Sequence, residues 1–536
     1  MSYQIVTYET LKVAPFEMIL HELKLEKKIQ DHARLHFTGR IAPEMEEQYV
    51  KMASHQLPVE MYYTDAMGKV HTLFHGIILK LHVKVDKEAH WLEAEAVSHT
   101  YAMDIKPQYR SFQDAAMSNL SVMKHICSTY TGASVLNTYT EEKTLGAFTL
   151  QYQETDWAFF KRLASHYNAP LLPAVTQSRI GIYVGIPDHQ DGGELNATHY
   201  RVYKDISTYK DLVEGAGAKL NEQDFICYEV VTDQVLELGD KVTFKDKALY
   251  VLNVVTEMKK GVLTHTYTLR SKASAYQRKI VNQRIIGASI QGKVAEVVRD
   301  EVKVQLEYDQ NWSKGTAYLF PYSTMYASED QTGWYCMPEP GDDVRIYFPG
   351  AKEAEGIALS TVRKKLPSQA SDGADNGQGT VGSSKRSSGI GANGSTSGGN
   401  TTVVTNTRTV TNTVVQTEQI QPIVHYDKDL KDDLMANPNT KFIMTPHGQR
   451  IMFEESGITI VGAGGGAWIS LTNDGTLILN SNNKIALHTG KQIEMAADSI
   501  VMLGNQIEMA TKEGPAGITL DQGQIKIRGV EVLMEE

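Results

Sequence analysis

The C-terminal residues from Lys441 to Glu536 repeat one short pattern ten times. Each repeat holds two apolar residues separated by a single residue, and the pairs are Ile451/Phe453, Ile458/Ile460, Ile469/Leu471, Leu477/Leu479, Ile485/Leu487, Ile493/Met495, Ile500/Met502, Ile507/Met509, Ile518/Leu520 and Ile525/Ile527. Successive pairs begin 7, 11, 8, 8, 8, 7, 7, 11 and 7 residues apart. Side chains alternate between the two faces of a strand, so each pair lies on one face. The sequence therefore predicts a ladder of very short strands.

Residues that turn the chain easily separate the repeats. They are Ser456-Gly457, Asn473-Asp474-Gly475, Ser481-Asn482-Asn483, Gly504-Asn505 and Gly523. Gly, Asn and Asp tolerate positive φ and so favour tight connections. A strand of three or four residues cannot bury a core by itself, so such repeats must stack along an axis.

Each repeat carries only one apolar stripe, and copies of the chain around a common axis would bury it most simply. We therefore expect a β-prism of three identical chains, about 50 Å long at about 4.8 Å per strand. The expected trimer core is Ile485, Leu487, Ile493, Met495, Ile500, Met502, Ile507, Met509, Ile518, Leu520, Ile525 and Ile527. The alternative is a single-chain β-solenoid, although solenoid coils generally have repeats of about 20 residues or more.

The composition bounds the class of protein. A chain of 536 residues has room for three or four domains. Its net charge of −11 argues against an electrostatic nucleic-acid surface. No apolar run approaches the ~20 residues of a membrane span. The segment Met1 to Thr10 lacks the basic and apolar regions of a signal peptide, so we expect synthesis in the cytoplasm and no use of the general secretory route.

Cysteines and histidines give no metal-binding pattern. Cys127, Cys227 and Cys336 lie about a hundred residues apart without CxxC spacing, which predicts buried reduced thiols. The histidines His71, His75, His82 and His90 occur singly on predicted strands, with no ligand set beside them. We predict no metal and no cofactor.

The rest of the chain divides by its patterning. Residues 1 to about 100 alternate apolar and polar residues, which predicts an antiparallel β domain with barrel-like closure. Residues 196–280 form a second β-rich segment, and we group residues 1–280 as one region. Helices are expected over Pro43–His55, over Asp114–Tyr130 and after an N-cap at Thr155, and a hairpin around Lys259-Lys260-Gly261.

A small barrel and a low-complexity segment follow. Residues 285–365 contain five short strand patterns, which suit a small closed barrel. Between Leu366 and Asn400, 17 of 35 residues are Gly or Ser, and a Thr/Val-rich stretch follows to residue 416. We expect residues 366–425 to be a linker with an extended segment, and residues 426–536 to be the β-prism.

Two long motifs carry a resemblance to a known family. The first has Ser98, Asp104, Lys106, Arg110, Ser111, Phe112 and Gln113, and the second has Gln151, Tyr152, Glu154, Thr155, Asp156, Trp157, Phe159, Arg162, Leu163 and Ala164. Both resemble the hub domain shared by VgrG spike proteins of type VI secretion systems, phage late-control baseplate hubs and related contractile injection systems. Met103 stands where the family has Leu.

Two further stretches extend this resemblance. The segment from Pro338 to Val344 resembles the OB-fold of the same spike family, and the segment from Met444 to Ile460 resembles the start of its β-prism. The implied fold class is mainly β: a hub of β-barrel domains with a few helices, a small OB-fold barrel and a C-terminal trimeric β-prism/β-helix spike.

The resemblance also implies a function and partners. The chain would cap an inner tube, join it to a baseplate and pierce the target envelope when a sheath contracts. The implied partners are two further copies of the chain, the inner-tube protein, baseplate or wedge proteins, and a separate tip protein or cargo effector. Contact with the target envelope would be transient, nucleic acid is not an expected partner, and the assembled particle would deliver the spike to or outside the target cell surface.

The sequence offers no catalytic site. It has no GxSxG elbow, HExxH motif or phosphate-binding loop, and the place where a puncturing spike could carry a lysozyme domain holds only the low-complexity segment. We therefore predict that the chain is not an enzyme. A peptidoglycan-degrading baseplate enzyme and a trimeric receptor-binding tail fibre are the alternatives.

Overall fold

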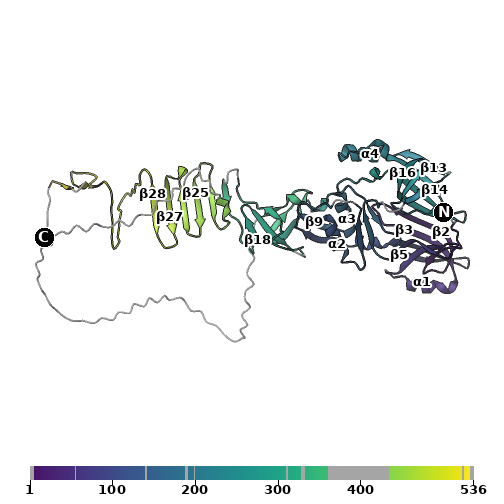
Figure 1. The fold of residues 1–536 in the computed structure, drawn as a ribbon. Coiled ribbons are helices and arrows are strands. Elements are labelled where there is room, and N and C mark those ends of the chain that lie inside the picture. Colours follow the sequence, from purple (N-terminus) through teal and green to yellow (C-terminus); the bar gives the residue numbers. More distant parts are fainter. Residues whose placement is uncertain are drawn as a thin grey trace, which may run out of the picture.

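The computed structural model describes residues 5–359 and 434–530, apart from residues 55, 139–141, 188–190, 198, 310–311, 328–331 and 522–523. The described chain is elongated, with the N-terminal β domains at one end, a small barrel in the middle and the C-terminal sheets beyond it (Figure 1). The predicted linker and extended segment, residues 366–425, lie outside the described residues.

A 12-stranded sheet forms most of the N-terminal region, which we call the hub. Its strands are β1 (Leu11–Ala14), β2 (Ile19–Lys28), β3 (Arg34–Ile41), β4 (Pro58–Thr64), β5 (Val70–Asp86), β6 (Ala89–Ser98), β12 (Asp191–Glu194), β13 (His199–Lys204), β14 (Ile226–Thr232), β15 (Lys241–Phe244), β16 (Lys247–Lys259) and β17 (Val262–Arg270). The main path runs β1-β4-β5-β6-β3-β2-β16-β17-β14-β13.

The N-terminal strands close only through β16 and β17, which come from the second β-rich segment of the hub. Thr7 bridges to Val262, and the Leu263 amide donates to the Val6 carbonyl at 2.8 Å, so the start of the chain reaches β17. Along β3, Leu35 and Phe37 are buried while His36 between them is exposed. The predicted hairpin around Lys259-Lys260-Gly261 joins β16 and β17.

Helices cover the hub and connect it to the barrel. They are α1 (Glu46–Met52), α2 (Asn119–Cys127), α3 (Asp156–Ser165) and α4 (Ile206–Lys210). Thr155 is the N-cap of α3 as predicted, because its hydroxyl accepts from the Ala158 amide at 3.2 Å. The prediction for α2 began too early. Ser118 caps it by accepting from the Ser121 amide at 3.1 Å, so the helix starts five residues after Asp114.

Two small sheets lie around these helices. One pairs β7 (Gln108–Phe112) with β9 (Thr149–Glu154), and the other contains β8 (Ser134–Asn137), β10 (Leu171–Pro173) and β11 (Gly181–Val184). The first of these sheets carries parts of both family-like motifs, which are thus neighbours in space.

The barrel that follows has five strands. They are β18 (Ser289–Val298), β19 (Glu301–Leu306), β20 (Leu319–Pro321), β22 (Asp343–Tyr347) and β23 (Ile357–Leu359), in the order β20-β19-β18-β22-β23. The two ends of this order meet, because Tyr322 forms a parallel bridge with Ala358 and the Ser323 amide donates to the Ala358 carbonyl at 2.8 Å. Val302, Phe320 and Ile346 fill the interior without solvent exposure.

The C-terminal repeats form two antiparallel sheets. The six-stranded sheet holds β21 (Gly333–Tyr335), β24 (Lys441–Met444), β25 (Arg450–Glu454), β26 (Gly457–Val461), β27 (Ala467–Thr472) and β28 (Leu477–Ser481). The three-stranded sheet holds β29 (Gln506–Ala510), β30 (Gly517–Asp521) and β31 (Gln524–Arg528). From β24 to β28, consecutive strands pair antiparallel, whereas the coils of a parallel β-helix stack parallel strands. This meander disfavours the single-chain solenoid.

Seven of the ten predicted repeats are strands. The other three, Ile485/Leu487, Ile493/Met495 and Ile500/Met502, lie in residues 482–505, where the structure has no strand. The helices of the described ranges include none that is long and apolar enough to cross a membrane.

The cysteines are free, and the prediction of buried thiols is wrong for one of them. Cys127 and Cys227 are buried, whereas Cys336 is exposed. Cys336 alternates along an extended segment with Tyr335 and Met337, which both face the barrel core, so its own side chain points outwards.

Candidate subunit interface

Eight apolar side chains share one face of the six-stranded sheet. The pairing register places them in two rows across β25–β28: Ile451, Ile460, Ile469 and Leu479 in one, and Phe453, Ile458, Leu471 and Leu477 in the other. Seven of these eight side chains are between 37% and 57% exposed, so nothing in the described chain covers them. Cross-strand apolar pairs normally stabilise a sheet by packing beneath a second layer.

This surface continues towards the barrel. Ile443 of β24 pairs with Ile451, and Trp334 of β21 pairs with Ile443. Trp334 is 41% exposed. The first row therefore extends over six strands, and we call these ten residues, from Trp334 to Leu479, the first apolar face.

The opposite side of the same sheet is different. Phe442, Met452 and Val461 alternate with residues of the first apolar face and are almost fully buried. Phe442 stacks on Tyr335, with ring centroids 5.0 Å apart. Beneath β24, β25 and β26 this side of the sheet is thus already part of the protein interior, whereas Ile478 of β28, on the same side, is 40% exposed. The first apolar face has no cover from the described chain along its whole length.

The three-stranded sheet repeats this arrangement. Its register brings Ile507, Leu520 and Ile525 into one row and Met509, Ile518 and Ile527 into another, all on the same face. We call these six residues the second apolar face. The other face carries Glu508, Thr519 and Lys526 in a third row. Six of the twelve residues predicted for the trimer core therefore share one face of this sheet.

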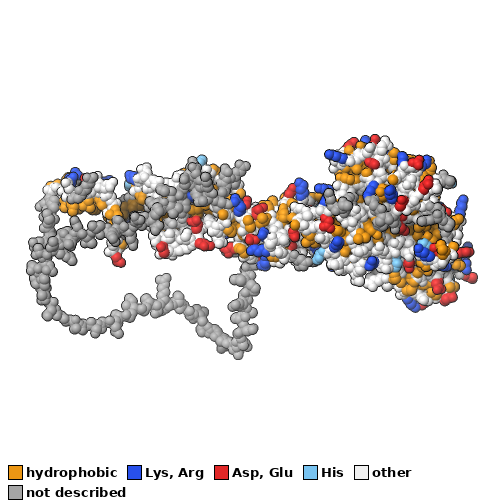
Figure 2. Space-filling view, in the orientation of Figure 1, with side chains coloured by type: hydrophobic (Ala, Val, Ile, Leu, Met, Phe, Trp, Pro, Cys, Tyr) orange, Lys and Arg blue, Asp and Glu red, His pale blue; other side chains and the backbone are white. Residues whose placement is uncertain are grey.

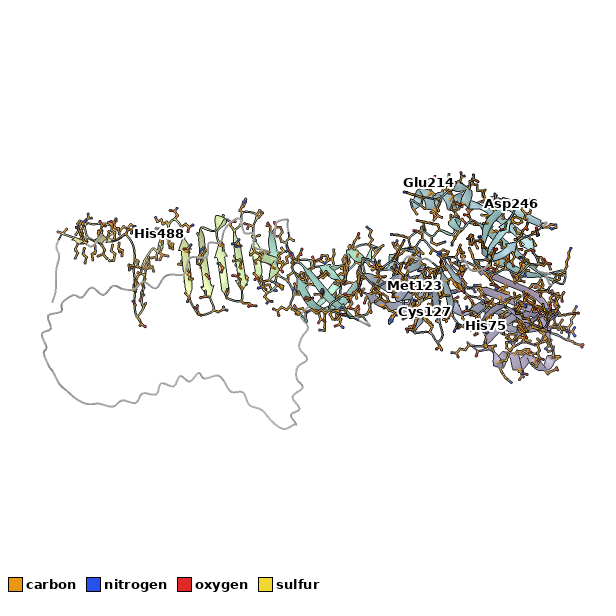
Figure 3. All side chains as sticks on the ribbon, viewed as in Figure 1. His75, Met123, Cys127, Glu214, Asp246 and His488 are labelled. Atoms are coloured by element: carbon orange, nitrogen blue, oxygen red, sulfur yellow. The ribbon has the colours of Figure 1, made fainter. Side chains whose placement is uncertain are left out.

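The other six predicted core residues are not brought together. Ile485, Leu487, Ile493, Met495, Ile500 and Met502 lie between the two sheets and are 49% to 64% exposed. His488, in the same segment, lies far from the other residues labelled in Figure 3. Hydrophobic side chains are visible at the surface of the far C-terminal part in Figure 2.

The list of core residues drawn from the sequence missed the larger face. The pairs from Ile451 to Leu479 belong to the same repeat pattern but were not assigned to the core. The only local signal for Trp334 is the alternation of Gly333-Trp334-Tyr335, which lies far upstream of the repeats that begin at Lys441. Its side of the strand could be inferred only from pairing with β24, which lies about a hundred residues later in the chain.

The family-like motifs form a buried polar network in the hub, around β7, β9 and α3. Arg110 pairs with Asp156, whose carboxylate also accepts from Gln151 at 2.8 Å and from the Tyr130 hydroxyl at 2.7 Å. Asp156 is fully buried. Burial and the bond to Asp156 raise the pKa of Tyr130, so its hydroxyl remains a donor.

A second part of the network connects the hub to the barrel. Arg162 of α3 is buried and binds Glu154 of β9 at 2.9 Å and Glu353 at 2.5 Å, the latter in a helical turn of the barrel. Burial raises the pKa of Glu154 even though Arg162 opposes that shift. Gln113 donates to the Val304 carbonyl of β19 at 2.8 Å. The motifs thus set the orientation of the barrel, and of the sheets that follow it, relative to the hub.

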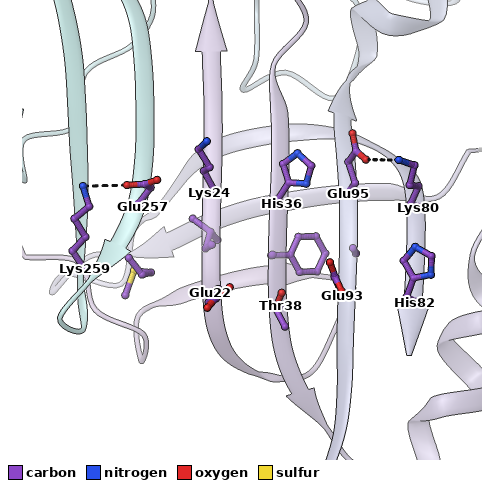
Figure 4. Close-up of a pocket in the computed structure, with 14 residues that line it drawn as sticks. Glu22, Lys24, His36, Thr38, Lys80, His82, Glu93, Glu95, Glu257 and Lys259 are labelled. Atoms are coloured by element: carbon purple, nitrogen blue, oxygen red, sulfur yellow. Dashed lines mark ion pairs between the residues drawn. The ribbon is translucent and has the colours of Figure 1, made fainter. Parts of the chain in front are cut away.

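A polar hollow of about 700 Å³ lies on the outer face of the hub sheet (Figure 4). Glu257, Lys24, His36, Glu95 and Lys80 form one row across it, from β16 to β5. Lys80 lies 3.3 Å from Glu95, and Lys259 lies 3.1 Å from Glu257.

The charges of this hollow do not suit acid catalysis. Burial alone would raise the pKa of Glu95, but Lys80 and Arg34 hold it below its ordinary value. A catalytic carboxylic acid needs a raised pKa to remain protonated near neutrality. In the described ranges, no group of three or more His, Cys, Asp or Glu side chains could hold a metal ion.

Comparisons with known proteins give structural neighbours only. No family model matches the sequence, and no curated protein matches it. The E. coli c3393 protein is described as a type VI secretion component similar to the T4 bacteriophage tail proteins gp27 and gp5. It has 14% identity and a TM-score of 0.45, with 66% of this chain and 99% of that chain covered.

Two other solved structures are similar. A Francisella PdpA–VgrG complex has 8% identity and a TM-score of 0.44, with 88% of this chain and 87% of that chain covered. The 43 kDa tail protein of prophage MuSo2 from Shewanella oneidensis has 9% identity and a TM-score of 0.39, with 50% and 99% covered. The structural neighbours are therefore VgrG-related type VI secretion proteins and phage tail proteins, at low sequence identity.

Proposed function

We propose that the chain is the hub and spike subunit of a contractile injection apparatus and that it acts as a homotrimer. The observation that carries this proposal is the first apolar face, a continuous exposed surface from Trp334 to Leu479 that recurs as the second apolar face. Soluble monomers rarely expose contiguous apolar patches of more than a few hundred Å². A surface of this kind therefore needs a cover.

Copies of the same chain are a suitable cover because the apolar face of one copy can pack against the identical faces of the others. Three sheets arranged around one axis would turn all their apolar faces inwards and form a triangular prism with a dry interior. Each newly buried side chain of this size contributes about 1.5–3 kcal/mol when fully covered. Glu508 and Lys526 on the opposite face would then face solvent, on either side of the buried Thr519. A face-to-face pair of chains is the competing assembly, and the mass in solution distinguishes it.

The motif resemblance supplies the role of the assembly. The hub would cap an inner tube and join it to baseplate or wedge proteins, the barrel would take the place of the family's OB-fold, and the prism would lead when the sheath contracts. A separate tip protein or a cargo effector would complete the particle. We propose that the chain is made in the cytoplasm and acts at or outside the target cell surface.

No observation favours the other two functions. The structural neighbours are tail and hub proteins rather than enzymes. A peptidoglycan-degrading enzyme would clear a cell-wall gel in zymography, and the proposed hub would not. A receptor-binding fibre would bind intact target cells and would not bind inner-tube protein, whereas the proposed hub should bind the tube.

Two adjacent residues of β31 provide a matched test of the interface. Ile525 belongs to the second apolar face and Lys526 to the polar side. Ile525→Asp should abolish the trimer, because three carboxylates would meet in an apolar core. Lys526→Asp places the same side chain one residue away and should leave the trimer intact. Mass by light scattering is the measurement, and equal behaviour of the two variants would contradict the proposal.

A further inference from the structure

Two histidines of the hub meet on one face of its strands. His75 of β5 lies directly opposite His99, the residue after β6, because Gly76 pairs with Ser98 in the antiparallel register. Opposite residues of an antiparallel pair point to the same face, with Cβ atoms about 4.5–5.5 Å apart. His75 Nδ1 is 2.9 Å from His99 Nε2, and both side chains are partly buried. In Figure 3, His75 lies far from the C-terminal sheets.

Packing on either side holds the two rings in place. Phe74 and Ser98, which flank them along the chain, are fully buried. The His75 amide donates to the Val175 carbonyl at 2.7 Å, and the Ser98 amide donates to the Ala33 carbonyl at 2.9 Å. Because the backbone is anchored at both histidines, rotation of the two side chains is enough to bring a common ligand between them.

The charge around the pair favours a cation. Burial lowers the pKa of His99, and the charge of His75 adds to this effect, so the His99 ring is neutral near pH 7. A histidine must be neutral to bind a metal ion. Glu60 of β4 lies directly opposite His75 on the other side, and its carboxylate accepts from Thr72 at 2.7 Å. A carboxylate thus shares one row of the sheet with the two imidazoles.

The distances suit a tetrahedral metal ion. Zn²⁺ holds imidazole nitrogens at about 2.0–2.1 Å, so two such nitrogens on one ion lie about 3.3 Å apart. Their ring centres, about 1.2 Å behind the nitrogens, are then about 5.3 Å apart. The ring centroids of His75 and His99 are 5.1 Å apart. A turn of each ring about its own centre therefore aims both nitrogens at one ion, and the centres shift by only a few tenths of an ångström.

We propose that this pair binds a divalent transition-metal ion such as Zn²⁺, with His75 Nδ1 and His99 Nε2 as its two protein ligands and water in the remaining positions. The ring that donates in the present pair then carries its proton on its other nitrogen, after exchange with water, so both facing nitrogens are free to bind.

The sequence alone shows His75 as a single histidine on a strand. His99 lies 24 residues later, and only the β5–β6 register makes it a partner. Two imidazoles are fewer than the three protein ligands of a typical open zinc site, so we expect moderate affinity. This inference goes beyond the proposed function and does not depend on the oligomeric state.

Calorimetric titration of the full-length protein at about pH 7.5 tests the site, with zinc chloride as the probe and magnesium chloride as the comparison. Zinc should bind at one ion per chain with a Kd on the order of 10 µM. Magnesium should not bind, because imidazole ligands suit zinc whereas magnesium prefers oxygen. No zinc binding, or equal binding of zinc and magnesium, would overturn the proposal.

Three variants test the residues. His75→Gln and His99→Gln each remove one ligand and should weaken zinc binding about tenfold or more. His71→Gln is the matched control, because His71 lies on the same strand and its ring is bonded to Asp65 at 2.9 Å. It should leave zinc binding unchanged. Equal weakening in His71→Gln and His75→Gln, or unchanged binding in His75→Gln or His99→Gln, would contradict the proposal. If one of the two ligand variants fails to fold, the other decides against the same control.

Discussion

At the scale of single residues, Arg162 is the side chain on which the hub–barrel junction depends most. It is buried between Glu154 and Glu353, which come from opposite sides of the junction. Removing its charge leaves the buried Glu154 and the half-buried Glu353 near each other with no cation between them. The sequence motif marked Arg162 but could not reveal Glu353, because that partner lies 191 residues away.

Arg162→Leu should therefore lower the free energy of unfolding of the hub and barrel by about 3–5 kcal/mol, as expected when one partner of a buried ion pair is lost. Arg201→Leu is the control, because Arg201 forms an exposed pair with Glu229 at 2.7 Å and its loss should cost less than about 1 kcal/mol. Urea denaturation followed by tryptophan fluorescence measures both. Equal costs would show that the junction does not depend on this network.

His265 should make the hub sensitive to acid. Burial lowers its pKa to about 3, and the charge of Lys27 adds to this effect. In the unfolded chain a histidine titrates near about pH 6.5, so below that pH the unfolded state binds the extra proton. Stability should then be full above about pH 6.5 and fall towards about pH 3 by up to about 1.4 kcal/mol per pH unit.

His265→Gln should remove that contribution. Denaturation midpoints compared at about pH 7.5 and about pH 5 measure it, because His265 should lose its share of stability between these values. His82→Gln, at an exposed position of β5, serves as the control and should keep the wild-type difference. A His265→Gln variant with the wild-type pH dependence would assign the acid sensitivity to other groups.

At the scale of elements, the local alternation of apolar residues predicted where the strands lie. The pairing partners of each strand decided which of its side chains are buried. Alternation placed β25–β31 because each contains its own apolar pair and turn residues. The prediction for α2 was too long because the cap at Ser118 outweighs the apolar spacing before it. Cys336 was misplaced because its orientation depends on which side of its strand meets the barrel core.

The need for pairing partners also explains why three of the ten predicted repeats are not strands. The pairs from Ile485 to Met502 have the alternation but no paired neighbour in the described chain. A short strand is stable only with partners and a covered face. The sequence could predict their pattern, and their proposed cover is the remainder of the trimer.

Two glycines test how tightly the meander packs. Gly457 has φ of 149°, and a Cβ there would lie 2.0 Å from the Leu471 carbonyl oxygen. Gly475 has φ of 87° with open space around it. Gly475→Ala should cost about 1–2 kcal/mol from backbone strain alone. Gly457→Ala should cost more, because β26 and β27 must also separate. Thermal unfolding compares the two, and equal melting temperatures would contradict the observed register.

At the scale of the whole molecule, the chain is a hub joined through a barrel to sheets that are incomplete alone (Figure 1). The sequence predicted the apolar stripes, and six of the twelve residues predicted for the trimer core share a face. It could not predict that the first apolar face starts at Trp334, because that strand joins the sheet across a long intervening segment.

In the proposed trimer, sister chains cover the two apolar faces. Light scattering coupled to size-exclusion chromatography of the full-length protein in dilute buffer tests this claim most directly. The predicted result is a single species with the mass of three chains that persists on dilution, because separation would expose both faces. A well-folded species with the mass of one chain would contradict the account.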